Sequence, residues 1–324
     1  MAKNKGFSEA QLEGRDGHSI KALCWTPRDH APRAVVHICH GMAEHAGRYD
    51  EFGQVLAQAG LAAVAHHHRG HDPALAPRDQ GHYADHNGWD LVLDDTARVQ
   101  HWIRDQWPDS PSFLLGHSMG SFIAQDALMR GVMPAIPDGL ILSATNLENP
   151  WRLRALRMLV ALERRRCGPR GRSPVLKRVT FDAFSASVKT PGTPFDWLSN
   201  DHQAVRNYIS DPACGFECTT QLWHDFSGGI QHLIRPDSQR AIPNNLPLFI
   251  LAGDQDPVGQ FGHGPTALAK AFRQTGHPRV ELKIYPGIRH EPFHDINRLE
   301  VFGDVLQWMA QQVDLRPIRQ SAAA

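Results

Sequence analysis

The residue run FLLGHSMGSFIA, which begins at Phe113, places one serine, Ser118, between two glycines directly after an apolar segment. If the apolar segment is a strand and the following segment a helix, the serine sits at the apex of a sharp turn, where its hydroxyl can attack a substrate carbonyl. The alternative is that the glycines merely permit a tight turn. In the first interpretation the turn is a nucleophile elbow, which comprises Gly116, His117 and Gly120 around the serine.

A serine nucleophile needs a general base and a carboxylate that orients the base. In a parallel α/β sheet these partners follow later strands, because functional loops gather at the carboxyl ends of the strands. Asp256 follows the apolar run LPLFILAGD and His290 follows the run VELKIYPG, so we predict that they are the acid and the base. The less favoured candidates are Asp254 and Glu148 for the acid and His294 for the base.

Attack on a carbonyl also requires N–H donors that stabilise the oxyanion. We expect the backbone N–H of Met119, directly after the serine, to be one donor. His40 and Gly41 end the apolar run AVVHICHG, and the next N–H, that of Met42, is the second candidate. An ordinary strand-to-helix loop with a flexible glycine is the alternative at this position.

The elements that must position these residues are apolar runs that alternate with amphipathic segments, after an opening hairpin over residues 10–25. This alternation predicts βαβ units, and therefore a mostly parallel central sheet with helices on both faces. Predicted strands cover residues 34–41, 61–67, 112–118, 139–145, 246–254 and 280–287, and predicted helices cover residues 49–59, 89–107, 120–130, 264–272 and 297–312.

Residues 146–240 interrupt the alternation and lack β-branched runs. We interpret this segment as an inserted, mainly helical cap on a single core, which residues 1–145 and 241–324 form together.

The first part of the predicted cap is strongly basic, because only Glu163 opposes the arginines and lysines between Trp151 and Arg178. A basic helix that also carries apolar side chains can rest on an anionic lipid surface. The alternative is a helix that buries its apolar face on the core while its arginines are solvated.

The overall composition argues against nucleic acid as a partner. The chain has 324 residues, and its 34 basic residues balance 34 acidic ones, whereas a nucleic-acid-binding protein of this size would usually be basic. The amino-terminal run MAKNKGFSEAQLEG lacks the apolar centre of a signal peptide, and five cysteines without a C-x-x-C pair indicate reduced thiols. We therefore expect a cytoplasmic protein, and peripheral contact with an anionic membrane through the basic cap stays open beside the alternative of a solvated cap helix.

The run HHHRGHD raises a rival chemistry. Some metallo-hydrolases use the pattern H-x-H-x-D-H, and His66, His68 and His71 match its three histidines. Gly70 occupies the position of the aspartate, and the chain offers no obvious set of further ligands, although a zinc site needs three or four donors. We expect loop histidines packed around the site, and neither a metal nor an organic cofactor.

Five segments together resemble monoacylglycerol lipases and the related bacterial lysophospholipases of the α/β-hydrolase superfamily. They are HGMAEHAGRYDEF, AHHHRGHD, LLGHSMGS, LAGDQDPV and YPGIRHE, of which H-G-x-x-E-H-x-x-R-Y is the most specific. The resemblance covers about residues 10–145 and 245–312, and FDWLSNDHQAVRNYISDPACGF is similar to the cap of the bacterial members. By position, the resemblance implies Ser118 as the nucleophile, Asp256 as the acid, His290 as the base, and Met42 and Met119 as the oxyanion donors.

The chain departs from the pattern of this family at three positions. His67 stands where an aspartate is usual, Asp72 replaces a glycine, and Ser121 replaces a second glycine after the elbow. These changes affect the loop over residues 66–82 and leave the predicted triad intact.

The resemblance implies a serine esterase that forms an acyl-enzyme on Ser118 and acts on a single-acyl lipid, either a monoacylglycerol or a lysophospholipid. The same scaffold also serves short-chain carboxylesterases, perhydrolases, C–C hydrolases and aminopeptidases, so other substrates stay open. A non-catalytic ligand-binding protein is a further alternative, which the intact triad disfavours.

Overall fold

An eight-stranded sheet forms the centre of the structure, a computed structural model that describes residues 6–189 and 191–313. The strands lie in the order β1-β2-β4-β3-β5-β6-β7-β8; the strands from β3 to β8 are parallel, whereas β1 and β2 are antiparallel to their neighbours. The strands are β1 (Ser8–Glu13), β2 (Ser19–Trp25), β3 (Val35–Cys39), β4 (Ala62–His66), β5 (Ser112–His117), β6 (Gly139–Ser143), β7 (Leu248–Gly253) and β8 (Val280–Tyr285).

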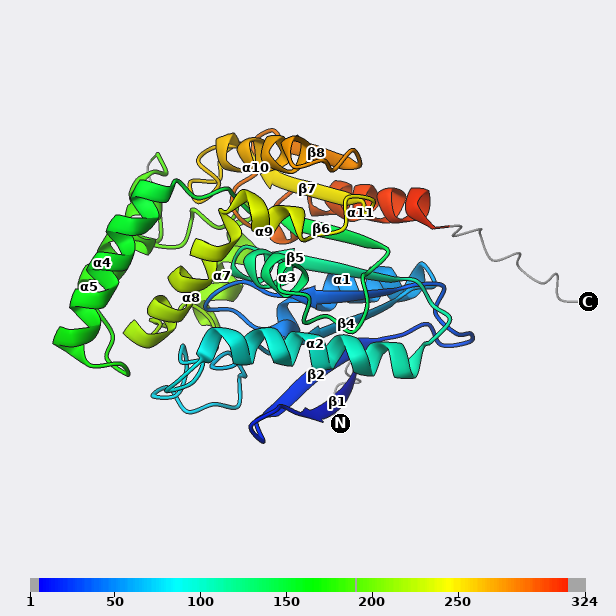
Figure 1. The fold of residues 1–324 in the computed structure, drawn as a ribbon, viewed down its shortest axis with the longest axis horizontal. Helices are drawn as coiled ribbons and strands as arrows, with labels where there is room; N and C mark the ends of the chain where they lie inside the picture. Colours follow the sequence, from blue (N-terminus) through cyan, green and yellow to red (C-terminus); the bar gives the residue numbers. More distant parts are fainter. Residues whose placement is uncertain (1–5, 190, 314–324) are drawn as a thin grey trace, which may run out of the picture.

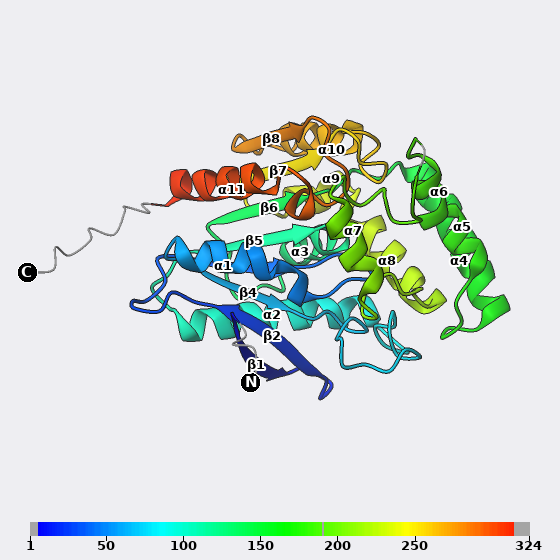
Figure 2. The ribbon, with the colours of Figure 1, turned by 180° about the vertical axis from the view of Figure 1, so that it is seen from behind.

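Helices cover both faces of the sheet, as the two opposite views show (Figures 1 and 2). On one face lie α1 (Asp50–Gln58) and α11 (Arg298–Gln312), and on the other lie α2 (Gly88–Gln106), α3 (Met119–Met129) and α10 (His263–Gln274). Every residue of strands β3 to β7 is buried, which explains why these strands read as continuous apolar runs rather than alternating ones. The predicted α/β architecture is confirmed.

The segment between β6 and β7 is helical and lies beyond the carboxyl ends of the parallel strands (Figure 1). Its longest helix, α4, is exposed at one end of the molecule, whereas α8 packs on α3 and α2 of the core. Its helices are α4 (Pro150–Cys167), α5 (Pro174–Val179), α6 (Phe181–Ala186), α7 (His202–Ser210), α8 (Thr220–Leu233) and α9 (Pro236–Arg240). We keep the term cap for this segment, and its exact limits at residues 146 and 240 remain a prediction.

None of the helices in the described part of the chain has both the length and the apolar character that crossing a membrane requires.

Candidate active site

The turn between β5 and α3 holds Ser118 in an unusual backbone conformation, with φ of 49° and ψ of −118°. Such a conformation in a residue other than glycine costs about 1–3 kcal/mol and persists only where the surroundings impose it. Here the surroundings are tight contacts at both glycines of the motif. A Cβ at Gly116 would overlap the carbonyl oxygen of Gly120, and a Cβ at Gly120 would overlap that of Cys39 on β3. The pattern G-x-S-x-G is therefore a steric requirement of this turn.

A continuous chain of hydrogen bonds joins the three residues that the sequence selects as nucleophile, base and acid. The Oγ of Ser118 lies 2.9 Å from Nε2 of His290, and Nδ1 of His290 lies 2.9 Å from Oδ1 of Asp256. Asp256 follows β7 and His290 follows β8, so both loops leave the carboxyl edge of the sheet beside the serine. Because a carboxylate only accepts hydrogen bonds, Nδ1 of His290 carries the proton and Nε2 is free to accept that of the serine.

Asp256 is fully buried, and its side chain is further fixed by the backbone N–H of Val258, which donates to Oδ1 over 2.9 Å. The other candidates have different partners. Asp254 accepts a hydrogen bond of 2.7 Å from the N–H of Gly287, and the ring of His294 packs against Tyr49 with centroids 5.5 Å apart. The structure therefore brings Asp256 and His290, rather than these two neighbours, to the serine.

The electrostatic surroundings of His290 favour its charged form. Burial alone would lower the pKa of this imidazole, but the adjacent Asp256 carboxylate outweighs burial and raises the pKa above the usual 6.5. The neighbouring ring of His117, 5.2 Å away between centroids, behaves in the opposite way. Burial, reinforced by the nearby His290, lowers the pKa of His117 to about 3, so this second imidazole stays neutral and does not compete for the proton.

The two residues proposed as oxyanion donors, Met42 and Met119, both line the cavity that contains the serine. Met119 is the first residue of α3, and an N–H in the first turn of a helix has no carbonyl partner within that helix. The loop before Met42 is fixed by Glu44, whose Oε1 accepts the N–H of Gly41 over 2.5 Å. The carbonyl of Ala43 accepts a hydrogen bond of 2.9 Å from the Tyr208 hydroxyl of the cap.

A buried ion-pair network, which sequence reasoning did not identify, connects this loop to the loop of the base. The guanidinium of Arg48 donates to both carboxylate oxygens of Glu291 over 2.5 and 2.7 Å, and to Glu44 over 2.7 Å. Burial opposes ionisation of Glu291, but Arg48 outweighs burial and lowers the pKa of this carboxyl to about 2. Glu44 and Arg48 belong to the run HGMAEHAGRY, and the available signal was that this run holds one residue of each charge four positions apart.

The three departures from the family pattern have local partners. The Nδ1 of His67 accepts a hydrogen bond from the N–H of Ala46, Asp72 forms an ion pair of 2.7 Å with Lys21, and the Ser121 hydroxyl donates to the carbonyl of Ser118. These contacts stabilise the loop and the elbow without touching the base or the acid.

A cavity above the serine has a largely apolar wall, supplied by the cap. It holds about 880 Å³ of space unoccupied by atoms, including its open mouth. The charged side chains among its described lining residues are carboxylates, namely Glu44, Glu148 and Glu291. Its apolar wall includes Leu153 and Leu156 of α4, Phe181 and Phe184 of α6, and Trp223 and Phe226 of α8.

Comparisons with known proteins agree with this geometry. Residues 30–297 match the family described as "Serine aminopeptidase, S33". The chain is 28% identical to a monoacylglycerol lipase of Mycolicibacterium smegmatis, over 94% of this chain and 98% of that protein, and 28% identical to human monoglyceride lipase, over 93% and 90%. The crystal structure of a thermostable carboxyl esterase from Bacillus coagulans, in complex with glycerol, superposes with a TM-score of 0.85 at 30% identity and covers 95% of this chain and 99% of the esterase.

The sheet order, the hydrogen-bonded serine and these similarities lead to one assignment. The chain belongs to the serine aminopeptidase S33 family and is an α/β-hydrolase of the esterase and lipase kind that resembles monoacylglycerol lipases.

Proposed function

We propose that this protein hydrolyses carboxylic esters of single-acyl lipids through an acyl-enzyme on Ser118. His290 removes the serine proton through Nε2 as Oγ attacks the ester carbonyl, and Asp256 holds the ring orientation and stabilises the imidazolium. The N–H groups of Met42 and Met119 stabilise the oxyanion, and His290 then protonates the leaving alcohol. Water, deprotonated by the same histidine, then attacks the acyl-enzyme, and His290 returns the proton to Oγ of Ser118 as the fatty acid leaves.

The observation that carries the proposal is the hydrogen-bonded chain from Ser118 through His290 to Asp256 on the floor of a cavity with an apolar wall. The hydrogen bonds supply the base that a serine needs, and the apolar wall suits an acyl chain, because burying each CH₂ group contributes about 0.8 kcal/mol.

The charges of the cavity favour a monoacylglycerol over a lysophospholipid. Glu44, Glu148 and Glu291 line the cavity, and its described lining includes neither lysine nor arginine. Glu44 and Glu291 are both paired with the buried Arg48, so a phosphate next to the ester would meet carboxylates and no cation that is free to pair with it. The hydroxyls of glycerol, by contrast, can donate to carboxylates. We expect kcat/KM for a monoacylglycerol to exceed that for the matching lysophospholipid by about tenfold or more, which corresponds to about 1.4 kcal/mol.

Labelling with a fluorophosphonate probe tests whether Ser118 is the nucleophile. The wild type should incorporate one probe per chain, and Ser118→Ala should incorporate none. Ser210→Ala, which removes an exposed hydroxyl on α7, is the matched control and should label like the wild type. Equal labelling of wild type and Ser118→Ala would contradict the assignment.

A substrate panel tests the substrate class separately. It compares monooleoylglycerol, oleoyl lysophosphatidylcholine, p-nitrophenyl butyrate and an aminoacyl anilide at equal concentrations. Faster cleavage of the anilide than of any ester would favour an aminopeptidase, the activity that the family description names. Preference for the lysophospholipid would overturn the argument from the cavity charges while leaving the nucleophile in place.

A further inference from the structure

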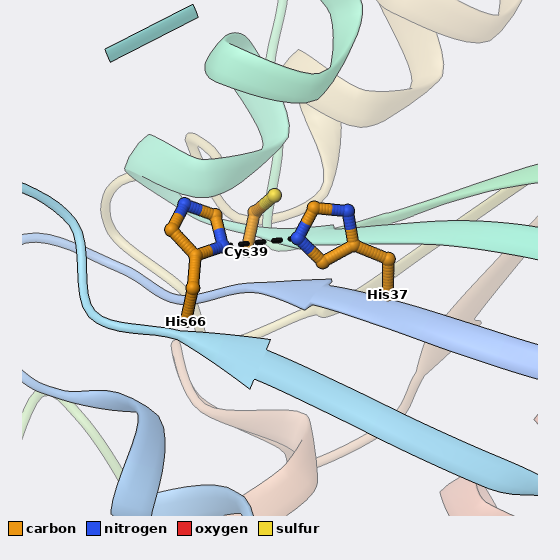
Figure 3. A group of neighbouring side chains, drawn as sticks. All are labelled: His37, Cys39 and His66. Atoms are coloured by element: carbon orange, nitrogen blue, oxygen red, sulfur yellow. Dashed lines mark hydrogen bonds between the residues drawn. The ribbon is translucent and has the colours of Figure 1, made fainter. Parts of the chain in front are cut away.

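A buried group of one thiol and two imidazoles lies outside the catalytic residues, on adjacent strands of the sheet (Figure 3). His37 and Cys39 are two residues apart on β3 and so point to the same face. The register pairs Ile38 with Ala65, which brings His66 of β4 beside Cys39. Each of the three side chains is at most 1% exposed, and each offers one ligand atom within 4.8 Å of the other two.

The hydrogen-bonding capacity of this group exceeds what the protein satisfies. The Nε2 of His37 and the Nδ1 of His66 share one hydrogen bond of 2.9 Å, but the other ring nitrogen of each has no partner among the described residues. His68, which is 2% exposed, packs edge-on against His66 with ring centroids 4.6 Å apart, and neither of its ring nitrogens has a hydrogen-bond partner in the described part of the chain. An ion bound between the two facing nitrogens would therefore replace their shared hydrogen bond, and no other hydrogen bond that the rings make within the described residues.

We propose that His37, Cys39 and His66 bind one soft transition-metal ion, with Cu(I) as the preferred ion. Thiolate and imidazole donors suit Cu(I) and Zn(II), whereas harder ions require oxygen ligands. The net charge of the bound complex distinguishes Cu(I) from Zn(II). One thiolate and two neutral imidazoles form a complex of zero net charge with Cu(I), but Zn(II) would leave an unpaired positive charge in the interior, which is costly.

The group needs only a small rearrangement to accept the ion. Metal–ligand bonds of about 2.0–2.3 Å separate neighbouring ligand atoms by about 3.3–3.7 Å, so the two hydrogen-bonded nitrogens must move apart by less than 1 Å. The sulfur lies within 4.8 Å of both and must approach them by about 1 Å at most. Burial raises the pKa of the Cys39 thiol far above its usual value, so the unbound group is protonated. Binding therefore releases one proton from the thiol to solvent, and the metal takes its place on sulfur. The ion changes no oxidation state in this step.

The location of the group indicates a structural rather than a catalytic role. The carbonyl of Cys39 lies directly against Gly120, in the first turn of the helix that follows the nucleophile. An ion that joins β3 to β4 would therefore stiffen the part of the sheet on which the elbow rests. Because the group is buried, we expect the ion to enter during folding.

Metal content of the refolded full-length chain tests this proposal. The protein is unfolded in guanidinium chloride and refolded without oxygen in the presence of one equivalent of Cu(I), or of Cu(I) and Zn(II) together. After desalting, metal is measured by plasma mass spectrometry. We expect one copper per wild-type chain, release of one proton per ion, and a higher Tm than for the metal-free protein.

Two variants remove ligands and one serves as a control. Cys39→Ala should lose the bound copper, and His37→Gln, which keeps the thiol, should weaken binding by tenfold or more in competition with a copper chelator. Cys218→Ala removes another buried free thiol, outside this group, and should retain one copper. Circular dichroism of each metal-free variant checks folding. Wild type without bound copper, or equal copper in Cys39→Ala and wild type, would overturn the site, and preferential uptake of Zn(II) would overturn the choice of ion.

Discussion

At the scale of single residues, the strained backbone of Ser118 and the two 2.9 Å hydrogen bonds of His290 make the site a unit. Neither hydrogen bond is useful alone, since the base must both receive the serine proton and keep its tautomer.

The first prediction concerns non-additive loss of activity. Ser118→Ala and His290→Ala should each lower kcat by about 10⁴-fold or more, and the double variant should lose little beyond either single one, because the two side chains serve one reaction step. Steady-state hydrolysis of a p-nitrophenyl ester provides the measurement. Multiplicative losses in the double variant would show that the residues act in separate steps.

The second prediction concerns the pH dependence of kcat/KM. The base works only as a neutral imidazole, so activity falls as the pH drops through the pKa of His290. Because Asp256 outweighs the effect of burial and raises this pKa above 6.5, the fall should be centred above 6.5 rather than at the reference value. Asp256→Asn, if it retains measurable activity, should shift the midpoint downward. A flat profile from pH 8 to pH 5, with the fold intact, would exclude His290 as the base.

At the scale of elements, the site depends on how closely a strand and a helix approach each other. Gly120 of α3 touches the carbonyl of Cys39 on β3 so closely that a Cβ has no room. The Cα of Gly120 and the carbonyl oxygen of Cys39 both belong to the main chain. Neither atom can move aside to make room for a Cβ, as the end of a flexible side chain could.

The third prediction tests this contact. Gly120→Ala should destabilise the protein by about 1–3 kcal/mol, as overpacking typically does, and should lower kcat because the elbow moves. Gly303→Ala is the matched control: it lies in α11, and an added Cβ there meets no atom within 4 Å. The control should be neutral or stabilising, by up to about 1 kcal/mol. Urea unfolding measures both, and equal free energies of unfolding for the two variants would contradict the steric argument.

Helix α4 has features of both interpretations of the basic segment, namely packing on the core and docking on an anionic lipid surface. Leu153 and Val160 are buried, as a cap helix packed on the protein requires, but Trp151 and Met158 are 74% and 70% exposed. Leu162, further along the helix, is 61% exposed. Apolar side chains exposed among arginines are the composition that anionic lipid surfaces attract, so we retain surface docking as a proposal.

The fourth prediction separates docking from ordinary cap structure. Replacing Arg152, Arg154 and Arg157 by glutamate should reduce hydrolysis of monoacylglycerol in anionic vesicles about tenfold or more, since each basic residue near such a surface contributes about 1 kcal/mol. Hydrolysis of a soluble short ester should be nearly unchanged, and added salt should reduce the difference between variant and wild type.

A second triple variant controls for net charge. Arg98→Glu, Arg104→Glu and Lys270→Glu change the same number of exposed basic side chains on α2 and α10, away from α4. This variant should behave like the wild type with both substrates. Equal losses with vesicles and with the soluble ester in the α4 variant would leave α4 as part of the cap only.

At the scale of the whole molecule, the interior holds several imidazoles that are neutral in the folded state. Burial lowers the pKa of His71 to about 4 and that of His294 to about 4, and burial with the adjacent His290 lowers that of His117 to about 3. In the unfolded chain each would titrate near 6.5.

The fifth prediction is that the protein loses stability in mild acid. Below pH 6.5 the unfolded chain binds protons that the folded protein does not, so the free energy of unfolding decreases as the pH falls from 6.5 towards 4. Each histidine with a folded pKa of about 4 accounts for a loss of about 2 kcal/mol at pH 5. Urea unfolding at pH 7, 6 and 5 measures the slope, and His71→Asn should reduce it. A stability that stays constant down to pH 5 would contradict the burial of these rings in neutral form.

The sequence was sufficient for the order of strands and helices in the core, because this order depends on local periodicity. It also selected Ser118, Asp256 and His290 from which residue follows each strand; the structure joins these three by hydrogen bonds, and their catalytic roles stay a prediction. It was not sufficient for the Arg48–Glu291 pair, because nothing local indicates that two loops far apart in the chain meet. The grouping of His37 with His66 likewise depends on the register of two strands, which a single sequence does not display.

The Arg48–Glu291 ion pair also has a consequence for biosynthesis. Its partners are 243 residues apart, so on the ribosome the loop that presents Met42 is made long before the second carboxylate that pairs with its arginine. A nascent chain that ends before β8 contains the serine but leaves Arg48 without Glu291 and Ser118 without its base. Emergence of the loop after β8 from the exit tunnel therefore supplies Glu291 to Arg48 and His290 to Ser118 together, and we expect the newly made protein to gain esterase activity only then.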